Sequence, residues 1–364
     1  MTDLPYLASR LYGTPLLIAR PKLDVILGVM ARKLAGDTLA TPPPDALLRS
    51  DSLQITDTGI AQIPILGTLV RRSSYLGAAS GLTSYHDIEA LAEAVFADPK
   101  VRAVLLEIDS SGGEAGGVFD LAQRLRTLAQ ISGKPLWAIA DEAALSAAYA
   151  LACAADRLWL TRTAEVGSIG VVAVHVDESG ADAQAGMHYT FLHAGAHKVD
   201  GHPHAPLPEV VATDIQTDLD QLHEQFIALV AGFRGLPPEA VRATEARVYR
   251  GEAAIQAGLA DQIGTPREAL AALQRQLATR GRRPLALRTP PNASLPSSQE
   301  ISMNDPTPVL PYDDTQLTPT PTPAPAPLNE AAITAKVEQR LRRQLAELTE
   351  IAAQAKRLGV AVDP

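Results

Sequence analysis

The chain has 364 residues, of which 46% are hydrophobic and 20% charged, so it can form a large globular core with an appendage. Its formal net charge of -9 excludes a general nucleic-acid binder, because such proteins use basic patches to displace counterions from phosphates. The single cysteine, Cys153, excludes a disulfide framework or a cysteine-based metal site within one chain. We expect it to be a small buried apolar residue.

Residues 1–50 are expected to form an N-terminal extension with one helix near Lys22 to Leu34, ending before three consecutive prolines. The most apolar part of this extension, Thr14 to Leu34, contains five charged side chains, which argues against a membrane span. It also lacks the apolar core and cleavage site of a signal peptide. The sequence therefore predicts a soluble, cytoplasmic protein.

Residues 51–276 alternate between strand-like and helix-like segments, which predicts an α/β domain with parallel strands. The expected strands are Ile60–Ile65, Val101–Ile108, Leu136–Ala140, Arg157–Leu160 and Ile169–Val176. The expected helices are Tyr85–Phe96, Val118–Leu128, Leu145–Ala154, Pro208–Gly232 and Gly251–Ala257. Ser84 and Asp87 resemble a capping box at the start of the first of these helices.

The C-terminal part of the chain changes composition. Residues 277–328 are rich in proline and threonine, which predicts an extended, semi-rigid linker without a fold of its own. Residues 329–364 are expected to form an amphipathic, scaffold-like helix. Because an isolated helix is marginal in water, we expect its apolar stripe to meet another chain. Met303 in the linker is a hypothetical internal start that would yield a separate protein containing this helix.

Five short segments carry the functional signal, in the chain order Ile108–Gly113, Ala143–Tyr149, Val166–Val171, Ala194–Gly201 and Val248–Asp261. Each segment alone is a weak signal, but five in order are specific. Together they resemble the signal peptide peptidase A family of Ser-Lys peptidases, over roughly residues 60 to 264. The resemblance implies an α/β fold of the ClpP/crotonase type, a spiral of parallel strands and helices, with neither cofactor nor metal.

The chemistry of such a site requires a serine whose proton is taken by a neighbouring base, and a lysine is a base only when neutral. Burial can lower the pKa of a lysine from about 10.4, because desolvation disfavours the ammonium. Ser146, among small apolar residues, is the candidate nucleophile, and the resemblance implies Lys198 as its general base. It also implies that Gly113 and Ala147 donate N–H groups to the oxyanion and that Ser168 orients the lysine.

The sequence departs from the family pattern at two places and leaves other chemistry open. Ser111 stands where a proline is common, and Ala147-Ala148 replaces a pair that usually contains glycine. His193 and His197 could serve a Ser-His mechanism, and His202-Pro203-His204 could bind a metal. No further ligand cluster or His-Glu-x-x-His helix supports a metal site, so none is expected.

Three features resemble the phage branch of the family: the N-terminal extension, the residues of the lysine segment Ala194–Gly201, and the tethered tail. That resemblance implies a head-maturation protease that processes scaffold, portal or capsid proteins. Because nucleophile and lysine can come from different protomers in this family, a homo-oligomer is expected. The alternatives are a cellular peptidase that degrades signal peptides at a membrane, and a non-catalytic scaffold protein that keeps a vestigial protease fold.

Overall fold

The computed structural model describes residues 11–34, 53–72 and 82–280 of the chain. The chain divides into two compact units, Met1–Arg288 and Thr289–Pro364, and every described residue belongs to the first. The expected tail helix, and the expected linker beyond residue 280, lie outside the described residues.

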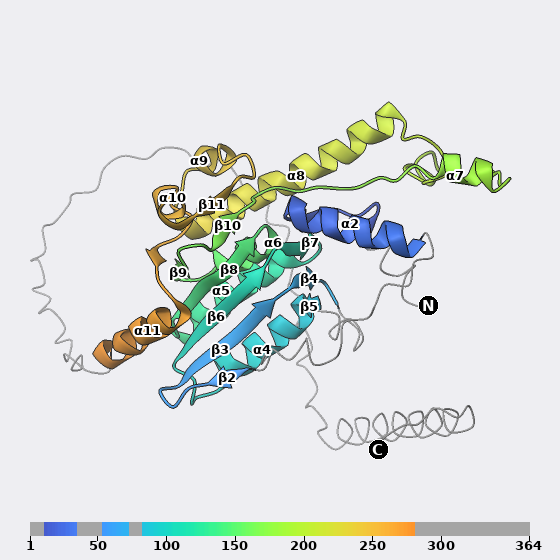
Figure 1. The fold of residues 1–364 in the computed structure, drawn as a ribbon. Helices are drawn as coiled ribbons and strands as arrows, with labels where there is room; N and C mark the ends of the chain where they lie inside the picture. Colours follow the sequence, from blue (N-terminus) through green and yellow to red (C-terminus); the bar gives the residue numbers. More distant parts are fainter. Residues whose placement is uncertain (1–10, 35–52, 73–81, 281–364) are drawn as a thin grey trace, which may run out of the picture. The chain divides into compact units, whose positions relative to one another are not determined.

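The larger sheet has eight strands and a parallel centre (Figure 1). Its path runs β11 (Val248–Arg250), β10 (Glu165–Gly167), β8 (Leu136–Leu145), β6 (Ala103–Ser110), β3 (Ile60–Leu66), β2 (Gln54–Ile55). Off this path, β9 (Arg157–Leu160) pairs with β8, and β12 (Gln262–Ile263) pairs with β9. Strands β3, β6, β8 and β10 pair in parallel in that order, and β9 also pairs with β8 in parallel. The expected α/β class with parallel strands is thereby confirmed.

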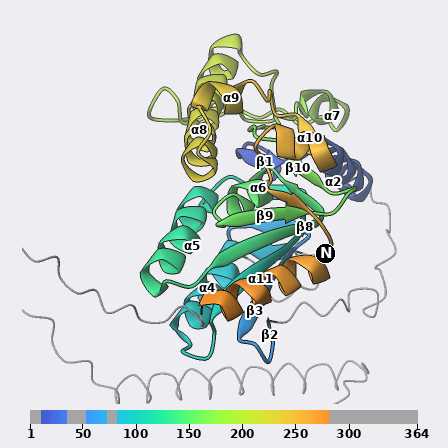
Figure 2. The same ribbon diagram turned by 90° about the vertical axis from the view of Figure 1, so that its left-hand side faces the viewer.

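Helices cover both faces of this sheet, which explains why its central strands are almost continuously apolar (Figure 2). Successive side chains of β6 point to opposite faces: Leu106 belongs to the larger core, and Leu105 to a smaller one. The larger core includes α4 (Tyr85–Ala97) and α5 (Val118–Ser132), whereas α11 (Pro266–Arg280) covers the smaller one.

A second sheet of four strands lies where the parallel strands end. Its order is β1 (Leu16–Ile18), β7 (Gly112–Glu114), β4 (Thr68–Val70), β5 (Leu82–Ser84). β7 follows β6 after one residue, so the chain leaves the large sheet and enters the small one at Ser111. β1 pairs with β7 antiparallel and is followed at once by α2 (Arg20–Leu34).

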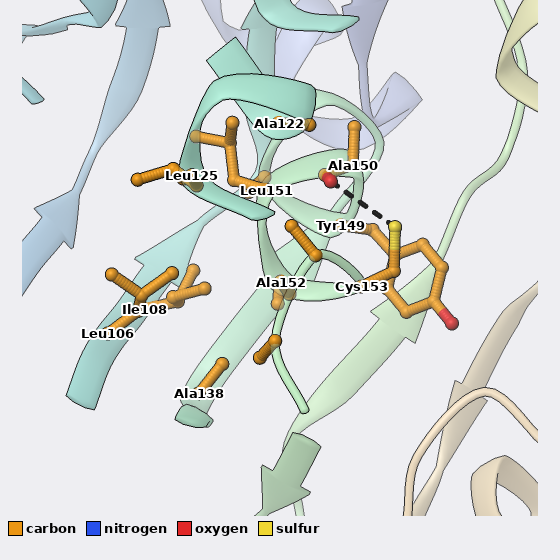
Figure 3. Close-up of a cluster of buried hydrophobic side chains, with 14 of the residues drawn as sticks. Leu106, Ile108, Ala122, Leu125, Ala138, Tyr149, Ala150, Leu151, Ala152 and Cys153 are labelled. Atoms are coloured by element: carbon orange, nitrogen blue, oxygen red, sulfur yellow. Dashed lines mark hydrogen bonds between the residues drawn. The ribbon is translucent and has the colours of Figure 1, made fainter. Parts of the chain in front are cut away.

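Helix α6 (Ala147–Ala152) is the most deeply buried helix segment that the structure describes, with all six residues inaccessible to solvent. Figure 3 shows its side chains packed against Leu106 and Ile108 of β6 and against Leu125 of α5. The Tyr149 hydroxyl donates a hydrogen bond to the Leu259 carbonyl at 2.8 Å, which ties the helix to a distant part of the chain. Because its side chains are mostly small, the helix can approach the sheet closely.

Cys153, directly after α6, is the buried small residue that the sequence predicts. Its Sγ lies 3.2 Å from the Ala150 carbonyl oxygen (Figure 3). Burial raises the pKa of its thiol to about 12. The thiol is therefore protonated and unreactive at neutral pH.

The chain then leaves the sheets in a long arm, residues 177–208 (Figure 1). The arm carries the short helix α7 (Ser179–Gln184) at its far end, and α8 (Glu209–Arg234) returns to the core. Two small elements, α9 (Pro238–Arg242) and α10 (Gly251–Gln256), complete this side. None of the helices in the described part of the chain is both long and apolar enough to cross a membrane.

Most expected elements are present within a few residues of their predicted ends, and two predictions are wrong. Leu145 ends strand β8 instead of opening a helix, because it pairs with Gly167 of β10. Residues 169–176 do not form a strand of their own and make only an isolated bridge at Val172. The predicted cap is confirmed, since the Asp87 N–H donates to the Ser84 hydroxyl at 3.3 Å.

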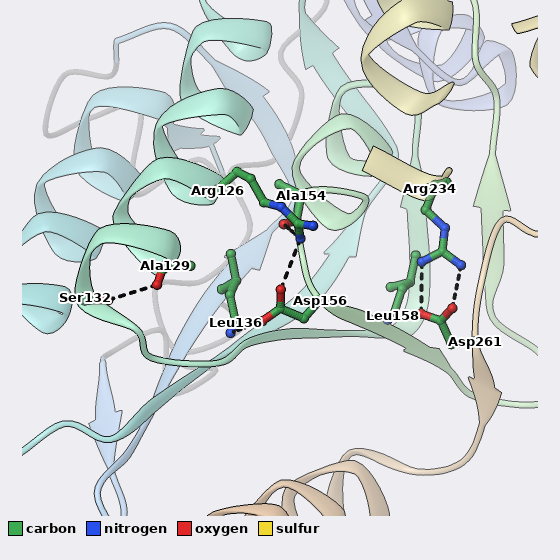
Figure 4. A network of polar contacts seen from close by, with 9 residues as sticks. All are labelled: Arg126, Ala129, Ser132, Leu136, Ala154, Asp156, Leu158, Arg234 and Asp261. Carbon is green, nitrogen blue, oxygen red and sulfur yellow. Dashed lines mark hydrogen bonds and ion pairs between the residues drawn. The ribbon is translucent and has the colours of Figure 1, made fainter. Parts of the chain in front are cut away.

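An ion pair fastens the C-terminal end of α8 to the sheet (Figure 4). The Arg234 guanidinium donates two hydrogen bonds to the Asp261 carboxylate, at 2.7 and 2.9 Å, and a third to the Gly258 carbonyl. The carboxylate also accepts from the Leu158 N–H of β9 at 2.7 Å. Burial alone would raise the pKa of Asp261, but the hydrogen bonds from Arg234 and Leu158 outweigh it and lower this pKa.

We expect Arg234→Ala to lower the free energy of unfolding by roughly 3 kcal/mol, because it leaves a partly buried carboxylate without its partner. The matched control is Arg242→Ala, which breaks the exposed Arg242–Glu224 pair and should lower the free energy of unfolding far less, because water screens an exposed pair. Urea unfolding at pH 7 measures both. The lowered pKa of Asp261 means that its stabilisation is present at pH 7 and is lost as the pH falls below about 4. Equal losses in the two variants would contradict this role of Arg234.

Candidate active site

Ser146 stands between the end of β8 and the start of α6, on a strained strand-to-helix turn. Its backbone has φ 55° and ψ -117°, a conformation with positive φ that residues other than glycine rarely adopt. Such a conformation costs on the order of 1–3 kcal/mol and persists only where its surroundings impose it. Here the Ser146 N–H donates to the Gly167 carbonyl of β10 at 2.8 Å, and α6 is locked in the core.

The Ser146 hydroxyl is buried but only weakly engaged. The residue is 1% exposed. Among the described residues its Oγ contacts the Gly170 carbonyl oxygen at 3.5 Å, which is long for a hydroxyl hydrogen bond. The hydroxyl is therefore held in place by its backbone and not by a strong acceptor.

A glycine turn faces the start of α6. Gly112 has φ 93°, and a Cβ at this position would lie 2.2 Å from the Leu17 carbonyl oxygen and 3.1 Å from the Ala147 nitrogen. A Cβ on Gly113 would lie 1.8 Å from the Leu69 carbonyl oxygen. Backbone from three segments thus converges where only glycine fits.

A buried serine holds this turn. The Ser110 hydroxyl donates to the Gly67 carbonyl at 2.6 Å and accepts from the Gly112 N–H at 3.1 Å. Ser110 is 2% exposed, so these bonds are shielded from water. The role of Ser110 is not evident from the sequence, because only the folded turn reveals its contacts.

The two expected oxyanion donors, Gly113 and Ala147, both lie next to Gly112: Gly113 follows it in the chain, and the Ala147 nitrogen lies close to it in space. Ala147 is the first residue of α6, where an N–H has no acceptor within the helix. Gly113 is the middle residue of β7 and pairs with Leu17 of β1 on one side and Leu69 of β4 on the other. The structure therefore brings Ser146 and both expected donors into one place.

Ser168 lies beside Ser146, at the end of the neighbouring strand. It follows Gly167, whose carbonyl accepts the hydrogen bond from the Ser146 N–H. Like Ser146, Ser168 has a positive φ, which is 54°. Its N–H donates to the Arg247 carbonyl at 2.9 Å. Its hydroxyl has no hydrogen-bond partner in the part of the chain that the structure describes.

Lys198 is not among these residues. It lies in the arm, is exposed to solvent, and its N–H donates to the Gly195 carbonyl at 3.2 Å. Within the described residues it makes no contact with Ser146. The arm leads away from α6 in Figure 1, so a single chain does not assemble the expected serine and lysine.

The histidines of the arm form local contacts. His197 pairs with Asp200 at 2.7 Å, and the hydrogen bond from this carboxylate raises the pKa of His197. His204 pairs with Asp182 at 2.8 Å and stacks on Tyr189. No group of three or more side chains that could hold a metal occurs among residues 11–34, 53–72 and 82–280.

A strained serine between strand and helix, next to a glycine turn, is an arrangement that suits a serine hydrolase on an α/β fold. The model of peptidase family S49 matches residues 129–280. Capsid assembly protease C of Escherichia phage lambda is 34% identical over 331 residues, which cover 85% of this chain and 75% of that protein. The chain belongs to peptidase family S49, the serine peptidases related to signal peptide peptidase A.

Other relatives match less of their own length. Head-tail preconnector protein GP5 of Enterobacteria phage P21 is 36% identical over 74% of this chain, which spans only 57% of that protein. A putative signal peptide peptidase SppA of Enterococcus faecium is 29% identical over 49% of this chain and 52% of that protein. An enoyl-CoA hydratase/isomerase family member superposes with a TM-score of 0.35 at 17% identity, covering 62% of this chain and 75% of that one.

We expect Gly112→Ala to destabilise the fold and to abolish peptidase activity, because the new Cβ would collide with backbone at the turn. The matched control is Gly133→Ala, since Gly133 also has positive φ but has nothing within 4 Å of a Cβ. The loss in unfolding free energy for Gly112→Ala should exceed that of the control by about 1–3 kcal/mol. Denaturant unfolding and casein cleavage measure the two effects; equal behaviour of the variants would contradict the steric argument.

Proposed function

We propose that the protein is a phage head-maturation endopeptidase in which Ser146 is the nucleophile and Lys198 the general base. The observation that carries the proposal is the strained, buried Ser146, held next to a glycine turn and the first N–H of α6. In the reaction the Ser146 oxygen attacks the scissile carbonyl while a base takes its proton. N–H groups of Gly113 and Ala147 then stabilise the oxyanion; such a donor contributes about 2.7–4 kcal/mol.

The base must come from outside the site that a single chain forms. A lysine acts as base only when desolvation lowers its pKa, and Lys198 is exposed in the arm. Large apolar side chains on the same arm are exposed as well, including Leu192 at 95% and Tyr189 at 49%. Such a surface favours burial against another protein. We therefore propose a homo-oligomer in which the arm of one protomer carries Lys198 to Ser146 of a neighbour.

The unengaged Ser168 hydroxyl fits this arrangement. It lies beside Ser146 on the strand end that holds the Ser146 N–H. A lysine amine entering from a neighbouring protomer would find an acceptor there, which supports the orienting role of Ser168. The site would then consist of a serine and an orienting hydroxyl from one chain and a lysine from the next.

The name of one phage relative, capsid assembly protease C, supports proteins of capsid assembly as substrates. We propose that these are scaffold, portal or capsid proteins, cleaved in the host cytoplasm or inside a procapsid. The first alternative, a cellular signal peptide peptidase, is favoured by a relative that matches less of this chain. The second, a scaffold protein with a vestigial site, is disfavoured by the backbone strain at Ser146. A protein without catalysis would gain nothing from that strain.

We expect Ser146→Ala and Lys198→Ala each to lower peptidase activity by roughly a thousandfold or more while leaving the fold intact, because the two residues act as one unit. The double variant should be no worse than either single one. Ser179→Ala and Lys100→Ala, at other sites in the described chain, serve as controls and should retain activity. Casein and capsid-protein cleavage with circular dichroism measure the outcome; wild-type rates in either dyad variant would remove that residue from the mechanism.

Mixing the two inactive variants tests whether protomers share sites. A site with Ser146 from one chain and Lys198 from its neighbour re-forms in mixed oligomers, so activity should recover to about a quarter of wild type at equal mixing in a ring. The control mixes Lys198→Ala with the double variant, which contains no Lys198 and should stay inactive. Subunit exchange is verified by native mass spectrometry. Exchange without recovery would show that each site is formed within one chain.

A further inference from the structure

The N-terminal strand β1 lies against the glycine turn in hydrogen-bonding register. The Ala19 N–H donates to the Ser111 carbonyl at 2.8 Å, and the Ala115 N–H donates to the Pro15 carbonyl at 3.3 Å. Hydrogen-bonded pairs in an antiparallel ladder recur at every second residue. The pair midway between these two, Leu17 with Gly113, is therefore also hydrogen-bonded, with the Gly113 N–H donating to the Leu17 carbonyl.

This places the Leu17 carbonyl at the expected oxyanion donors. Its oxygen and the Ala147 nitrogen lie 2.2 and 3.1 Å from the point that a Cβ of Gly112 would occupy. Gly113 and Ala147 are the two residues whose N–H groups would bind the carbonyl of a bond under attack. The carbonyl of Leu17 thus stands where a substrate carbonyl would stand.

The other edge of β1 is bound as well. Leu16 exchanges two hydrogen bonds with Val172, at 2.8 and 2.9 Å, and the Gly13 N–H donates to the Val174 carbonyl at 3.0 Å. Residues 13–19 are therefore held in extended form between two backbone edges. Extended peptides are recognised in this way, with main-chain hydrogen bonds for affinity and pockets for alternate side chains. Leu16, Leu17 and Ile18 are all buried.

We propose that residues 13–19 occupy the substrate groove of the peptidase as an internal substrate mimic, which blocks the site until it is displaced. The inference rests on the proposed function. Leu17 takes the place of the residue whose carbonyl is attacked, so the groove suits extended peptides with an apolar residue at that position. Because the mimic is part of the chain, its effective concentration is on the order of millimolar or higher, and weak strand pairing suffices to hold it.

Space for a longer peptide continues beyond the strand. A cavity of about 840 Å³ lies at the N-terminal end of β1, with walls formed by Thr14, Pro15, Arg71, Glu114, Phe119 and Gln225. A substrate that replaces residues 13–19 could therefore extend past the position of Pro15.

A reversible cross-link tests the proposal. Leu16 and Val172 form a hydrogen-bonded antiparallel pair, whose Cα separation of about 5.5 Å suits a disulfide. Cys153 is fully buried with its pKa raised to about 12, so it does not compete. The disulfide in Leu16→Cys/Val172→Cys should form under mild oxidant and lower casein cleavage at least about tenfold, and dithiothreitol should restore it. Each single-cysteine variant should show no redox dependence.

A release variant tests the same point in the opposite direction. Leu17→Asp places a charge at a fully buried position and should expel the strand, so the apparent KM should fall while kcat stays unchanged, as for removal of a competitor. The control Val25→Asp makes the same change at a position that is 59% exposed on α2. Hydrogen exchange of residues 13–19 reports whether the strand has left.

The outcomes separate the two proposals. If the disulfide does not form, the strand does not occupy the groove in solution. If it forms and the oxidised protein cleaves as fast as the reduced one, or if a released strand leaves KM unchanged, the segment does not block the site. If the Leu17→Asp variant cleaves no protein substrate although hydrogen exchange shows that its strand has left, and the wild type cleaves none either, the proposed function fails and the blocking role falls with it.

Discussion

The backbone of Ser146 is the constraint on which the site depends. A positive φ at a serine is unfavourable, and it is imposed here by two rigid neighbours, strand β8 and the fully buried helix α6. The Ser146 hydroxyl lies 3.5 Å from the Gly170 carbonyl oxygen, and the nitrogen of the next residue, Ala147, lies close to Gly112. Tyr149, bonded to the Leu259 carbonyl, anchors the helix that holds the turn. Packing far from Ser146 thus fixes the backbone of the proposed nucleophile.

The sequence predicts most of the large sheet because its strands are short apolar runs and its helices have clear periodicity, as in β6 and α4. Boundaries at the site are less predictable. Leu145 has the propensity of a helix residue, yet pairing with Gly167 keeps it in β8. Likewise, the apolar run at residues 169–176 resembles a strand, but it forms only an isolated β-bridge, at Val172. Tertiary contacts override local preference in both cases.

The candidate site is predictable in part. Motif order identifies Ser146, Gly113, Ala147 and Ser168, and the fold brings these four together. The proposed role of β1 could not be predicted from the sequence, because Leu16–Ile18 is one short apolar run among many. Only its pairing with β7 shows that it lies against the glycine turn. Lys198 belongs to a segment with exposed apolar residues, which forms the proposed contact with a neighbouring protomer. The position of Lys198 in the proposed oligomer cannot be predicted from one chain, because it depends on contacts with a neighbouring protomer.

The most direct test is an experimental structure of the assembled oligomer in which the Ser146 and Lys198 side chains are resolved. We expect Lys198 Nζ of one protomer to lie within hydrogen-bond reach of Ser146 Oγ of its neighbour, about 2.6–3.2 Å, and to be shielded from solvent. Access to this site would require that residues 13–19 leave the groove. A complete oligomer in which Lys198 stays in solvent in every protomer, far from any Ser146, would contradict the Ser-Lys mechanism proposed for this chain.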